Sequence, residues 1–329
     1  MRKTKFIFPF LLILLFSCRK EDAARPGALV PLTVDQDPTL PSLHINGTQL
    51  HVETYGNPSD PLLVMIHGGP GADYRSMLDS KAFAKEGFYV IFYDQRGAGL
   101  SKREDAGQFR GENAIKLYID DLHALITHFR VSDTQKVFLM GHSWGAMLAT
   151  GYINQYPEKV SGAVLSEPGG LTWTQTSEYL SRSNKVKFFS EAISDMTFPE
   201  QFFAGRSEHE ILDYKASFSA TYENAPGNTI GNAGHYPSWR SGAVAFKTSI
   251  ENVDRYGFDF TTQLHLYQPK ILFLYSELNT AYGPEWAKTV SSVYPRAELR
   301  LISNSGHEIP YFGWTDYYSY SLTYLNEMK

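Results

Sequence analysis

A serine stands between two glycines in the sequence GHSWG at residues 141–145. The apolar run Val137–Met140 precedes it, and the helix-forming run Ala146–Ala149 follows. A turn this tight between a strand and a helix has no room for side chains beside the serine, which explains the glycines. The turn exposes Ser143 Oγ, and the N-terminus of the next helix lies beneath the negative charge that develops on attack. We therefore expect Ser143 to be a nucleophile.

A nucleophilic serine needs a base, and His307 is the candidate. It lies in the segment Asn304–Glu308, directly after a predicted strand at Leu299–Ile302. From a loop past the last strand of a parallel sheet, its imidazole can reach Ser143, take the hydroxyl proton and return it to the leaving group.

A glycine-rich loop, HGGPG at residues 67–71, follows another apolar run. Backbone N–H groups of such a loop can stabilise the oxyanion that forms during attack on a carbonyl. We expect the donors to be Gly69 and Trp144, the residue after the nucleophile. Loss of one such donor typically costs ~100–1000-fold in rate. We expect His67 to be structural.

These residues need a sheet to position them. The alternation of buried strands and amphipathic stretches such as Asn113–Arg130 predicts an α/β fold, with a mostly parallel eight-stranded sheet and helices on both faces. Leu43–Tyr55, with Asn46-Gly47 near its start, predicts a hairpin. Ligands of such a sheet bind at the carboxyl ends of its strands. Continuous apolar runs, typical of strands buried on both faces, occur at Leu62–Ile66, Tyr89–Tyr93, Val137–Met140, Ala163–Leu165 and Ile271–Tyr275.

One interval interrupts this alternation. Roughly a hundred residues separate the strand near Leu165 from the one that starts at Lys270, too many for an unstructured loop. We predict a helical cap at residues 171–262 over the strand ends. The α/β core then consists of residues 43–170 and 263–329.

Four motifs together resemble the proline iminopeptidase family of α/β-hydrolases: HGGPG at 67–71, DQRGAGLS at 94–101, GHSWG at 141–145 and Gly306-His307. The resemblance covers the chain from about residue 43 onward, the cap excepted. It implies an α/β-hydrolase fold and cleavage of N-terminal residues, often proline, from short peptides. It also implies that Asp94 and Arg96 brace the loops around the site. The family commonly has Gly at the position of His142.

The same superfamily usually carries its triad acid after the strand Ile271–Tyr275, where this chain has Asn279 instead of aspartate. An amide can orient an imidazole but cannot stabilise its positive charge. Glu167, directly after the preceding strand, resembles the acid of haloalkane dehalogenase relatives, and we expect it to complete the triad. Glu277 is the alternative acid, and a triad with Asn279 or a degenerate site also remains open.

Three functions are compatible with these residues: an aminopeptidase of the iminopeptidase type acting through an acyl-enzyme, a carboxylesterase or lactone hydrolase, and a non-catalytic surface lipoprotein. An aminopeptidase needs acidic groups near the site to capture the substrate ammonium. Acidic residues are common on any solvated helix, so their presence does not decide the question. Candidates in the cap are Glu191, Glu200, Glu208, Glu210 and Glu223.

The N-terminus is typical of an export signal. Three basic residues precede the apolar run 6–16, which is too short to span a bilayer. Cys18, the only cysteine, follows in the sequence LFSC, which resembles a bacterial lipobox, and acylation also accounts for a lone cysteine in an exported chain. Residues 19–22 resemble the surface-export tag of Bacteroidetes lipoproteins. We expect a signal peptide at 1–17, a lipid-anchored tether at 18–42 and a location at the outer membrane or cell surface, with an ordinary secretory signal as the alternative.

Charge and composition exclude other classes of function. The 329 residues carry a net charge of −5, with no basic run after the extreme N-terminus, so we expect no nucleic-acid partner. No metal-ligand motif or dinucleotide-binding loop occurs, so we expect no metal and no cofactor. The expected partners are a small peptide or ester substrate and, through the lipid anchor, a membrane.

Overall fold

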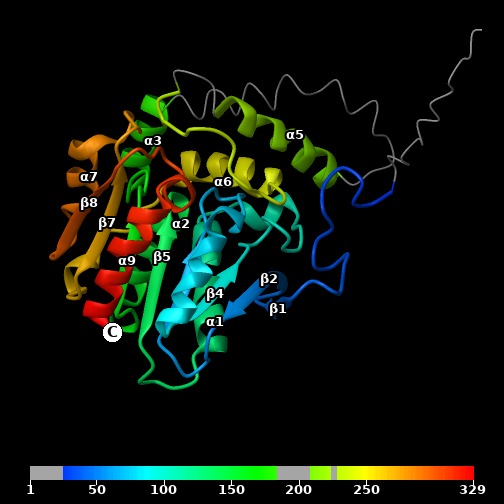
Figure 1. Cartoon of the computed structure of the whole chain (residues 1–329). Coiled ribbons are helices and arrows are strands. Elements are labelled where there is room, and N and C mark those ends of the chain that lie inside the picture. The colour runs from blue at the N-terminus through cyan, green and yellow to red at the C-terminus, as the bar shows by residue number, and fades with distance from the viewer. Residues whose placement is uncertain (1–24, 184–207, 224–227) are drawn as a thin grey trace, which may run out of the picture.

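The computed structural model describes residues 25–183, 208–223 and 228–329. Its centre is an eight-stranded sheet in the order β1-β2-β4-β3-β5-β6-β7-β8 (Figure 1). The β1–β2 and β2–β4 pairs are antiparallel and the remaining pairs are parallel, as the sequence predicts. The strands are β1 (Ser42–Ile45), β2 (Thr48–Tyr55), β3 (Leu62–Ile66), β4 (Tyr89–Tyr93), β5 (Val137–His142), β6 (Gly162–Ser166), β7 (Ile271–Ser276) and β8 (Ala297–Ile302).

The hairpin β1–β2 turns where the sequence predicts. Asn46 and Gly47 have φ angles of 44° and 74°, the left-handed region that a two-residue hairpin turn requires at both positions. Every residue of β3, β4, β5 and β6 is buried, which accounts for their continuous apolar sequences.

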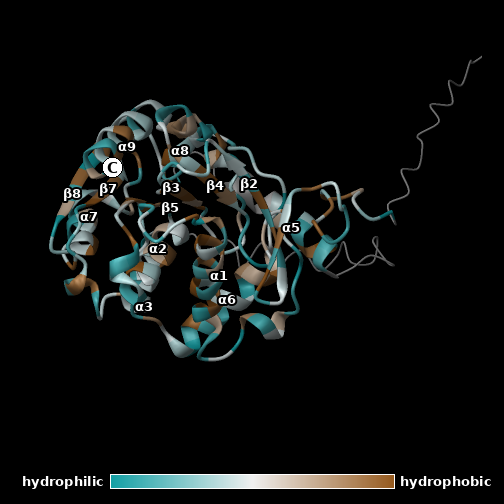
Figure 2. Ribbon diagram, turned by 90° about the horizontal axis from the view of Figure 1, so that it is seen from below, coloured by the Kyte–Doolittle hydropathy of each residue, from teal (hydrophilic) through white to brown (hydrophobic). Residues whose placement is uncertain are grey.

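Helices cover both faces of the sheet and confirm the predicted α/β-hydrolase architecture. In Figure 2 the inner strands are mostly hydrophobic and the outer helix turns mostly hydrophilic. No helix within the described residues is long and apolar enough to cross a bilayer. One face carries α1 (Ala114–Phe129), α2 (Trp144–Gln155) and α7 (Gly283–Ser291), and the other carries the 3₁₀ helix η1 (Arg75–Glu86), α8 (Ile309–Phe312) and α9 (Trp314–Met328).

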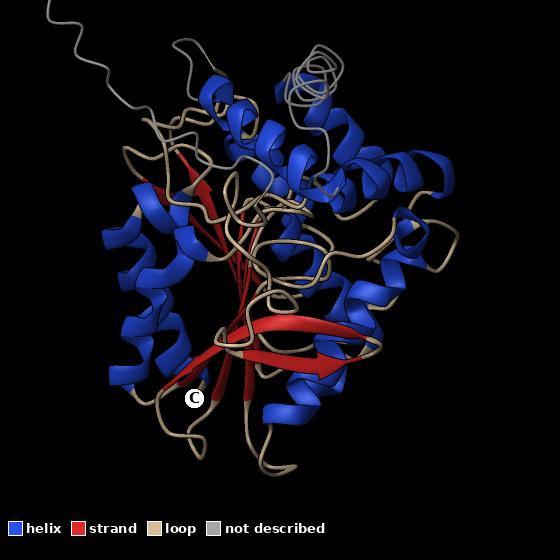
Figure 3. Ribbon diagram, turned by 90° about the vertical axis from the view of Figure 1, so that its right-hand side faces the viewer, coloured by secondary structure: helices blue, strands red, loops and turns tan. Residues whose placement is uncertain are grey.

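Three helices from the interval 171–262 lie above the carboxyl ends of the parallel strands: α3 (Trp173–Ser183), α5 (Glu208–Glu223) and α6 (Ala243–Tyr256) (Figures 1 and 3). The cap with bounds 171–262 stays a prediction, and these three helices are the part of it that the structure describes. Residues 184–207 and 224–227 of the interval lie outside the described residues.

The tether predicted at residues 18–42 is wrong over its second half. Val30 and Val34 are only 6% and 2% exposed, and the Val34 N–H donates to the carbonyl of Leu100 at 2.9 Å. Arg240 Nη1 also donates to the carbonyl of Pro31 at 2.7 Å. Burial of these valines and backbone bonds to the core hold this segment against the body, although its Pro and Asp content suggested a loose linker. Residues 1–24, with the predicted signal peptide and Cys18, lie outside the described part of the chain.

A buried carboxylate attaches the helices above the strands to the core. Asp213 on α5 is fully buried, and its Oδ2 accepts from Arg103 Nε at 2.8 Å and from Arg240 Nε at 2.7 Å. Its Oδ1 accepts from the N–H of Ala243, the first residue of α6, at 2.9 Å. One side chain therefore joins α5, the start of α6 and the loop after β4.

We expect Asp213→Ala to lower the free energy of unfolding by about 3–5 kcal/mol, because two buried guanidinium groups lose their anion. Urea unfolding of the two proteins measures this difference. Asp254→Ala, an exposed aspartate on α6, serves as the control and should change stability by about 0.5 kcal/mol or less. Equal stability of the Asp213 and Asp254 variants would contradict the anchoring role.

Candidate active site

Ser143 lies at the junction of β5 and α2 in a backbone conformation that residues other than glycine rarely adopt, with φ 54° and ψ −121°. The flanking glycines make this turn possible. A Cβ on Gly141 would lie 2.4 Å from the carbonyl oxygen of Gly145, and a Cβ on Gly145 would lie 2.0 Å from that of Ile66. The Ser143 N–H donates to the carbonyl of Ser166 at 2.8 Å, which ties the turn to the end of β6.

His307 reaches Ser143 from the loop between β8 and α8. Its Nε2 lies 3.0 Å from Ser143 Oγ, and the side chain is almost fully buried. The N–H of His307 donates to the carbonyl of Ile230 at 2.8 Å, so the interval above the strand ends also supports this loop. The distance from base to hydroxyl suits proton transfer.

Glu167 follows β6 and contacts the ring nitrogen of His307 that does not face Ser143. Its Oε2 lies 2.7 Å from His307 Nδ1, and no part of the residue is exposed. Its Oε1 accepts from the N–H and the Oγ of Ser276 at 2.8 and 2.5 Å, and its Oε2 also accepts from Asn279 Nδ2 at 2.7 Å. The structure thus brings Ser143, His307 and Glu167 into one hydrogen-bonded series.

Asn279 occupies the position where the family pattern has an aspartate. Its amide donates both to Glu167 and to the hydroxyl of Tyr179, at 2.7 and 3.1 Å. An aspartate there would place two buried carboxylates at hydrogen-bond distance, which electrostatic repulsion disfavours. The asparagine at 279 and the glutamate at 167 are therefore complementary, and Asn279 supports the acid of the series.

Glu277, the alternative acid, lies away from His307. It is exposed, and its Oε2 accepts from the N–H of Asn304 at 2.8 Å. The structure does not bring Glu277 into the hydrogen-bonded series.

The two predicted oxyanion donors line the same pocket as Ser143. Trp144 is the first residue of α2, so its N–H has no acceptor within the helix. Gly69 has φ 121°, in the region that favours glycine, and a Cβ on its neighbour Gly68 would lie 3.2 Å from Ser143 Cβ. This loop therefore approaches the nucleophile closely enough to face a carbonyl bound there.

Polar contacts brace the loops, as predicted for Asp94 and Arg96. Asp94 Oδ2 accepts from the N–H of Leu100 at 2.8 Å, and Arg96 forms a bidentate pair with Asp121 at 2.9 and 2.8 Å. His67 is structural, as expected: its Nδ1 lies 2.7 Å from its neighbour's carbonyl and its Nε2 accepts a backbone N–H at 2.9 Å. Burial lowers the pKa of His67. The lowered pKa favours the neutral imidazole, in which Nε2 can accept this hydrogen bond.

A pocket of ≈ 200 Å³ opens beside Ser143, beneath α3 and α6. Its carboxylates are Asp73 and Glu308, and no lysine or arginine of the described chain lines it. Hydrophobic side chains dominate the lining: Met147, Trp173, Phe246, Ile250 and Phe258.

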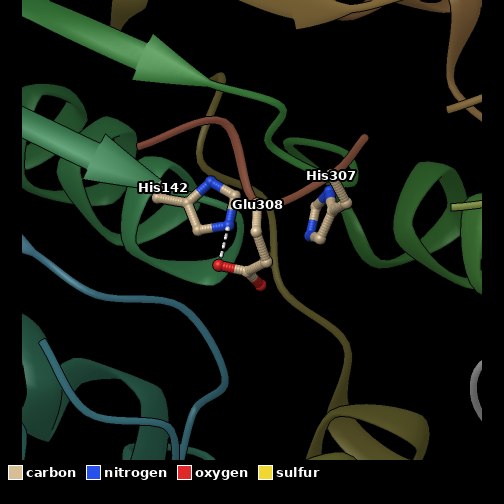
Figure 4. A group of neighbouring side chains, drawn as sticks. All are labelled: His142, His307 and Glu308. Atoms are coloured by element: carbon tan, nitrogen blue, oxygen red, sulfur yellow. Dashed lines mark ion pairs between the residues drawn. The ribbon is translucent and has the colours of Figure 1, made fainter. Parts of the chain in front are cut away.

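His142 and Glu308 border the series, and their donor atoms lie within 4.8 Å of one another and of a nitrogen of His307 (Figure 4). Such a group has the composition of a metal site. Both nitrogens of His307, however, already face Ser143 and Glu167. The cluster is therefore better described as a hydrogen-bonded series with His142 and Glu308 beside it than as a metal centre.

Sequence patterns missed Ser276, Tyr179 and Glu308. Ser276 ends β7, the strand next to β6, so the order of the parallel strands could have indicated that it lies beside Glu167. Tyr179 lies in α3, and no motif marks it. Glu308 directly follows the base in the chain, and this adjacency was its signal.

The chain resembles known hydrolases over most of its length. The family model described as serine aminopeptidase, S33, matches residues 57–231. A proline iminopeptidase of Lactobacillus helveticus is 36% identical over 277 residues, which cover 79% of this chain and 88% of that protein. The proline iminopeptidase PfmaB of Pestalotiopsis fici is 27% identical over 284 residues, 81% of this chain and 92% of that protein.

Solved structures share the fold. The proline iminopeptidase-related protein of Thermus thermophilus has a TM-score of 0.60 at 19% identity, covering 88% of this chain and 99% of that one. A thermophilic esterase from Thermogutta terrifontis has a TM-score of 0.58 at 18% identity, covering 88% and 97%. At these identities the likeness supports the fold alone.

Burial makes the charge on Glu167 costly. Desolvation raises the pKa of Glu167 from 4.5 to about 7, although hydrogen bonds from Ser276 and Asn279 oppose this shift. The folded protein therefore holds this proton more tightly than the unfolded chain. The stability that the folded protein gains from binding this proton is fully present below pH 4.5, and it is lost as the pH rises through about 7.

We compare the free energy of unfolding of Glu167→Gln with that of the wild type at each pH. As the pH rises from 4 to 8, this difference should shift by about 3 kcal/mol in favour of the variant, because the wild type loses the proton of Glu167 and glutamine has none to lose. Urea unfolding at a series of pH values measures this change. Glu277→Gln removes an exposed carboxylate and should show no comparable trend. A stability difference that does not vary with pH would show that the fold does not oppose the charge on Glu167.

Proposed function

The chain belongs to the serine aminopeptidase family S33, and on that premise we propose that it removes N-terminal residues, proline among them, from short peptides through an acyl-enzyme. The observation that carries this proposal is the hydrogen-bonded series from Ser143 Oγ through His307 to Glu167 at the edge of a pocket. This is the arrangement of a nucleophile, a base and an orienting acid.

In the proposed reaction, Ser143 Oγ attacks the carbonyl carbon of the first residue while His307 Nε2 takes the hydroxyl proton. The carboxylate of Glu167 stabilises the imidazolium and fixes the tautomer that leaves Nε2 unprotonated before attack. The N–H groups of Gly69 and Trp144 stabilise the oxyanion. His307 then protonates the departing amine, the acyl-enzyme forms, and water hydrolyses it with His307 again as the base.

The size of the pocket supports a small acyl group. Its ≈ 200 Å³ lies below the ~300–1,000 Å³ typical of pockets for drug-sized ligands. A single residue next to Ser143 suits this space better than a long acyl chain. The names of the relatives agree, since two proteins that align with more than three quarters of this chain are proline iminopeptidases.

We expect the protein to hydrolyse proline- or alanine-naphthylamide, with activity that Ser143→Ala abolishes because no nucleophile remains. A fluorophosphonate probe should label the wild type only. A nitrophenyl ester assayed in parallel tests the alternative, because turnover of the ester without turnover of any aminoacyl amide would identify a carboxylesterase. Persistent labelling of Ser143→Ala would refute this serine as the nucleophile.

Two matched variants test the acid in the same assay. Glu167→Gln keeps the shape of the side chain but loses its charge, so kcat should fall on the scale of ~10⁴-fold. Glu277→Gln should leave kcat nearly unchanged, because its exposed carboxylate accepts from the N–H of Asn304 and does not belong to the series of Ser143, His307 and Glu167. If Glu277→Gln lost most of its kcat while Glu167→Gln kept a nearly normal kcat, the acid would be Glu277.

We also propose that the protein is exported and held at a bacterial membrane surface by a lipid on Cys18. Support comes from the sequence, in which basic residues, the apolar run 6–16 and LFSC occur in the order of a lipoprotein signal. The body begins to pack at about residue 30, which leaves a short linker of roughly ten residues after Cys18.

We expect Cys18→Ala to move the protein from the membrane fraction into the soluble exported fraction, because acylation requires the thiol. Fractionation and intact-mass measurement of the wild type and the variant check this. Cys18→Ser is the nearest control in shape and should behave like alanine. A soluble wild type without acyl mass would contradict the anchor.

A further inference from the structure

We infer that His142, His307 and Glu308 bind a zinc ion, and that the ion inhibits the protein reversibly by taking His307 Nε2 away from Ser143 Oγ. Without an ion, the hydrogen-bonded series of Ser143, His307 and Glu167 describes the site. Zinc competes with that series for one nitrogen atom. The inference goes beyond the proposed function, because it holds whichever acyl group the protein hydrolyses.

The three side chains carry donor atoms that zinc prefers. Two imidazoles and one carboxylate are the protein ligands of a common class of zinc site, whose fourth position stays open. One donor atom from each of the three residues lies within 4.8 Å of the other two, and all three residues are buried. They also line the pocket beside Ser143, through which an ion can enter. In Figure 4 the Glu308 side chain lies between the two histidine rings.

Two of the donor atoms already have the spacing of zinc ligands. Zinc binds nitrogen and oxygen at about 2.0–2.2 Å with tetrahedral angles, so two atoms bound to one ion lie about 3.4 Å apart. His142 Nε2 and Glu308 Oε2 are 3.4 Å apart. This pair can therefore hold the ion between its atoms with little rearrangement, and a modest movement of the His307 ring completes the set.

His142 also provides a reason for an ion to bind. Its residue is only 3% exposed, and neither ring nitrogen has a hydrogen-bond partner. A buried polar atom without a partner raises the free energy of the folded state. Ser143, His307 and Glu167 bond to one another without any contribution from His142. An ion at Nε2 would give this imidazole the partner that the protein does not supply.

Glu167 prepares His307 to act as a ligand. Histidines that bind metals usually donate their other ring N–H to a carboxylate, which fixes the tautomer and makes the ligating nitrogen more basic. Glu167 Oε2 lies 2.7 Å from His307 Nδ1, so the nitrogen left for an ion is Nε2. The same nitrogen faces Ser143 Oγ at 3.0 Å. It cannot hold zinc and accept the hydroxyl proton at once, so the bound ion is an inhibitor.

Other acidic groups of the described residues do not form a rival site in the pocket. Asp73, the second carboxylate of the lining, already accepts four hydrogen bonds from the protein. Glu210 accepts from the N–H of Gly27 at 3.2 Å and does not line the pocket. No lysine or arginine of the described chain lines it to repel a cation. The remaining cap glutamates lie outside the described residues, as whole residues or as side chains: Glu191, Glu200, Glu208 and Glu223.

Fluorophosphonate labelling of Ser143 tests the site without a known substrate. We expect Zn²⁺ to slow labelling of the wild type and EDTA to restore the rate. Mg²⁺ and Ca²⁺ at the same concentration should have no effect, because they prefer oxygen ligands. In His142→Phe, which keeps a ring, the Zn²⁺ concentration that halves the protein's own labelling rate should rise at least ~10-fold. His265→Ala removes an exposed histidine outside the pocket and should leave that concentration unchanged.

Calorimetry with Zn²⁺ on Ser143→Ala, prepared without a histidine tag, measures binding apart from any reaction. Adding His142→Phe or Glu308→Gln should weaken binding, because each change removes a ligand. Adding Glu167→Gln should weaken it by about 10- to 100-fold, as for loss of a carboxylate that orients a metal-binding imidazole. Glu277→Gln, which removes an exposed carboxylate away from the site, is the matched control and should bind as the parent does.

Several results would overturn the inference. One is equal zinc sensitivity of the wild type and His142→Phe, and another is zinc binding that none of the ligand variants weakens. Binding that depends on His142 but does not slow labelling would refute the inhibition, and a protein that binds no zinc would refute the site. Failure of the proposed function has a different signature. Zinc-sensitive labelling without turnover of any aminoacyl amide would refute the aminopeptidase and still support the zinc site.

Discussion

A carboxylate without any exposed surface, Glu167, is the group on which the site depends. Its charge is expensive to bury, and three residues offset that cost by donating to its oxygens: Ser276, Asn279 and His307. These donors come from the end of β7, the loop after it and the loop after β8. The acid thus holds together three segments at one edge of the sheet, and His307 is oriented as a consequence. Loosening of any of these segments would leave a buried charge with fewer partners.

Ser143 is positioned by a different kind of constraint, which is steric. Ser143 holds an unfavourable backbone conformation because α2 must follow β5 immediately, and Gly145 packs against the carbonyl of Ile66 in β3. Strand packing thus fixes the hydroxyl, whereas hydrogen bonds fix the imidazole. The two systems meet at the 3.0 Å contact between Oγ and Nε2. Errors in strand register would therefore separate Ser143 Oγ from His307 Nε2.

The layer above the strand ends determines what can reach that contact. Asp213 fastens α5 and the start of α6 to the core, and the side chains of α3 and α6 form much of the hydrophobic wall beside Ser143. His307 also depends on this layer, since its N–H donates to the carbonyl of Ile230. The pocket and the position of His307 are therefore coupled. A change in the helices above the sheet affects the contact between Ser143 and His307 as well as the space in the pocket.

Local sequence determined the strands, the hairpin turn at Asn46-Gly47 and the chain order of Ser143, Glu167 and His307, because burial on both faces and tight turns restrict residue type within a few positions. It did not decide between Glu167 and Glu277, since each follows a strand end. Only the tertiary structure separated them, because direction at a strand end depends on the backbone: Glu167 turns inward at φ 44°, and Glu277 points to solvent. The packing of Val30 and Val34 and the place of Glu308 were likewise decided by contacts between segments distant in the sequence.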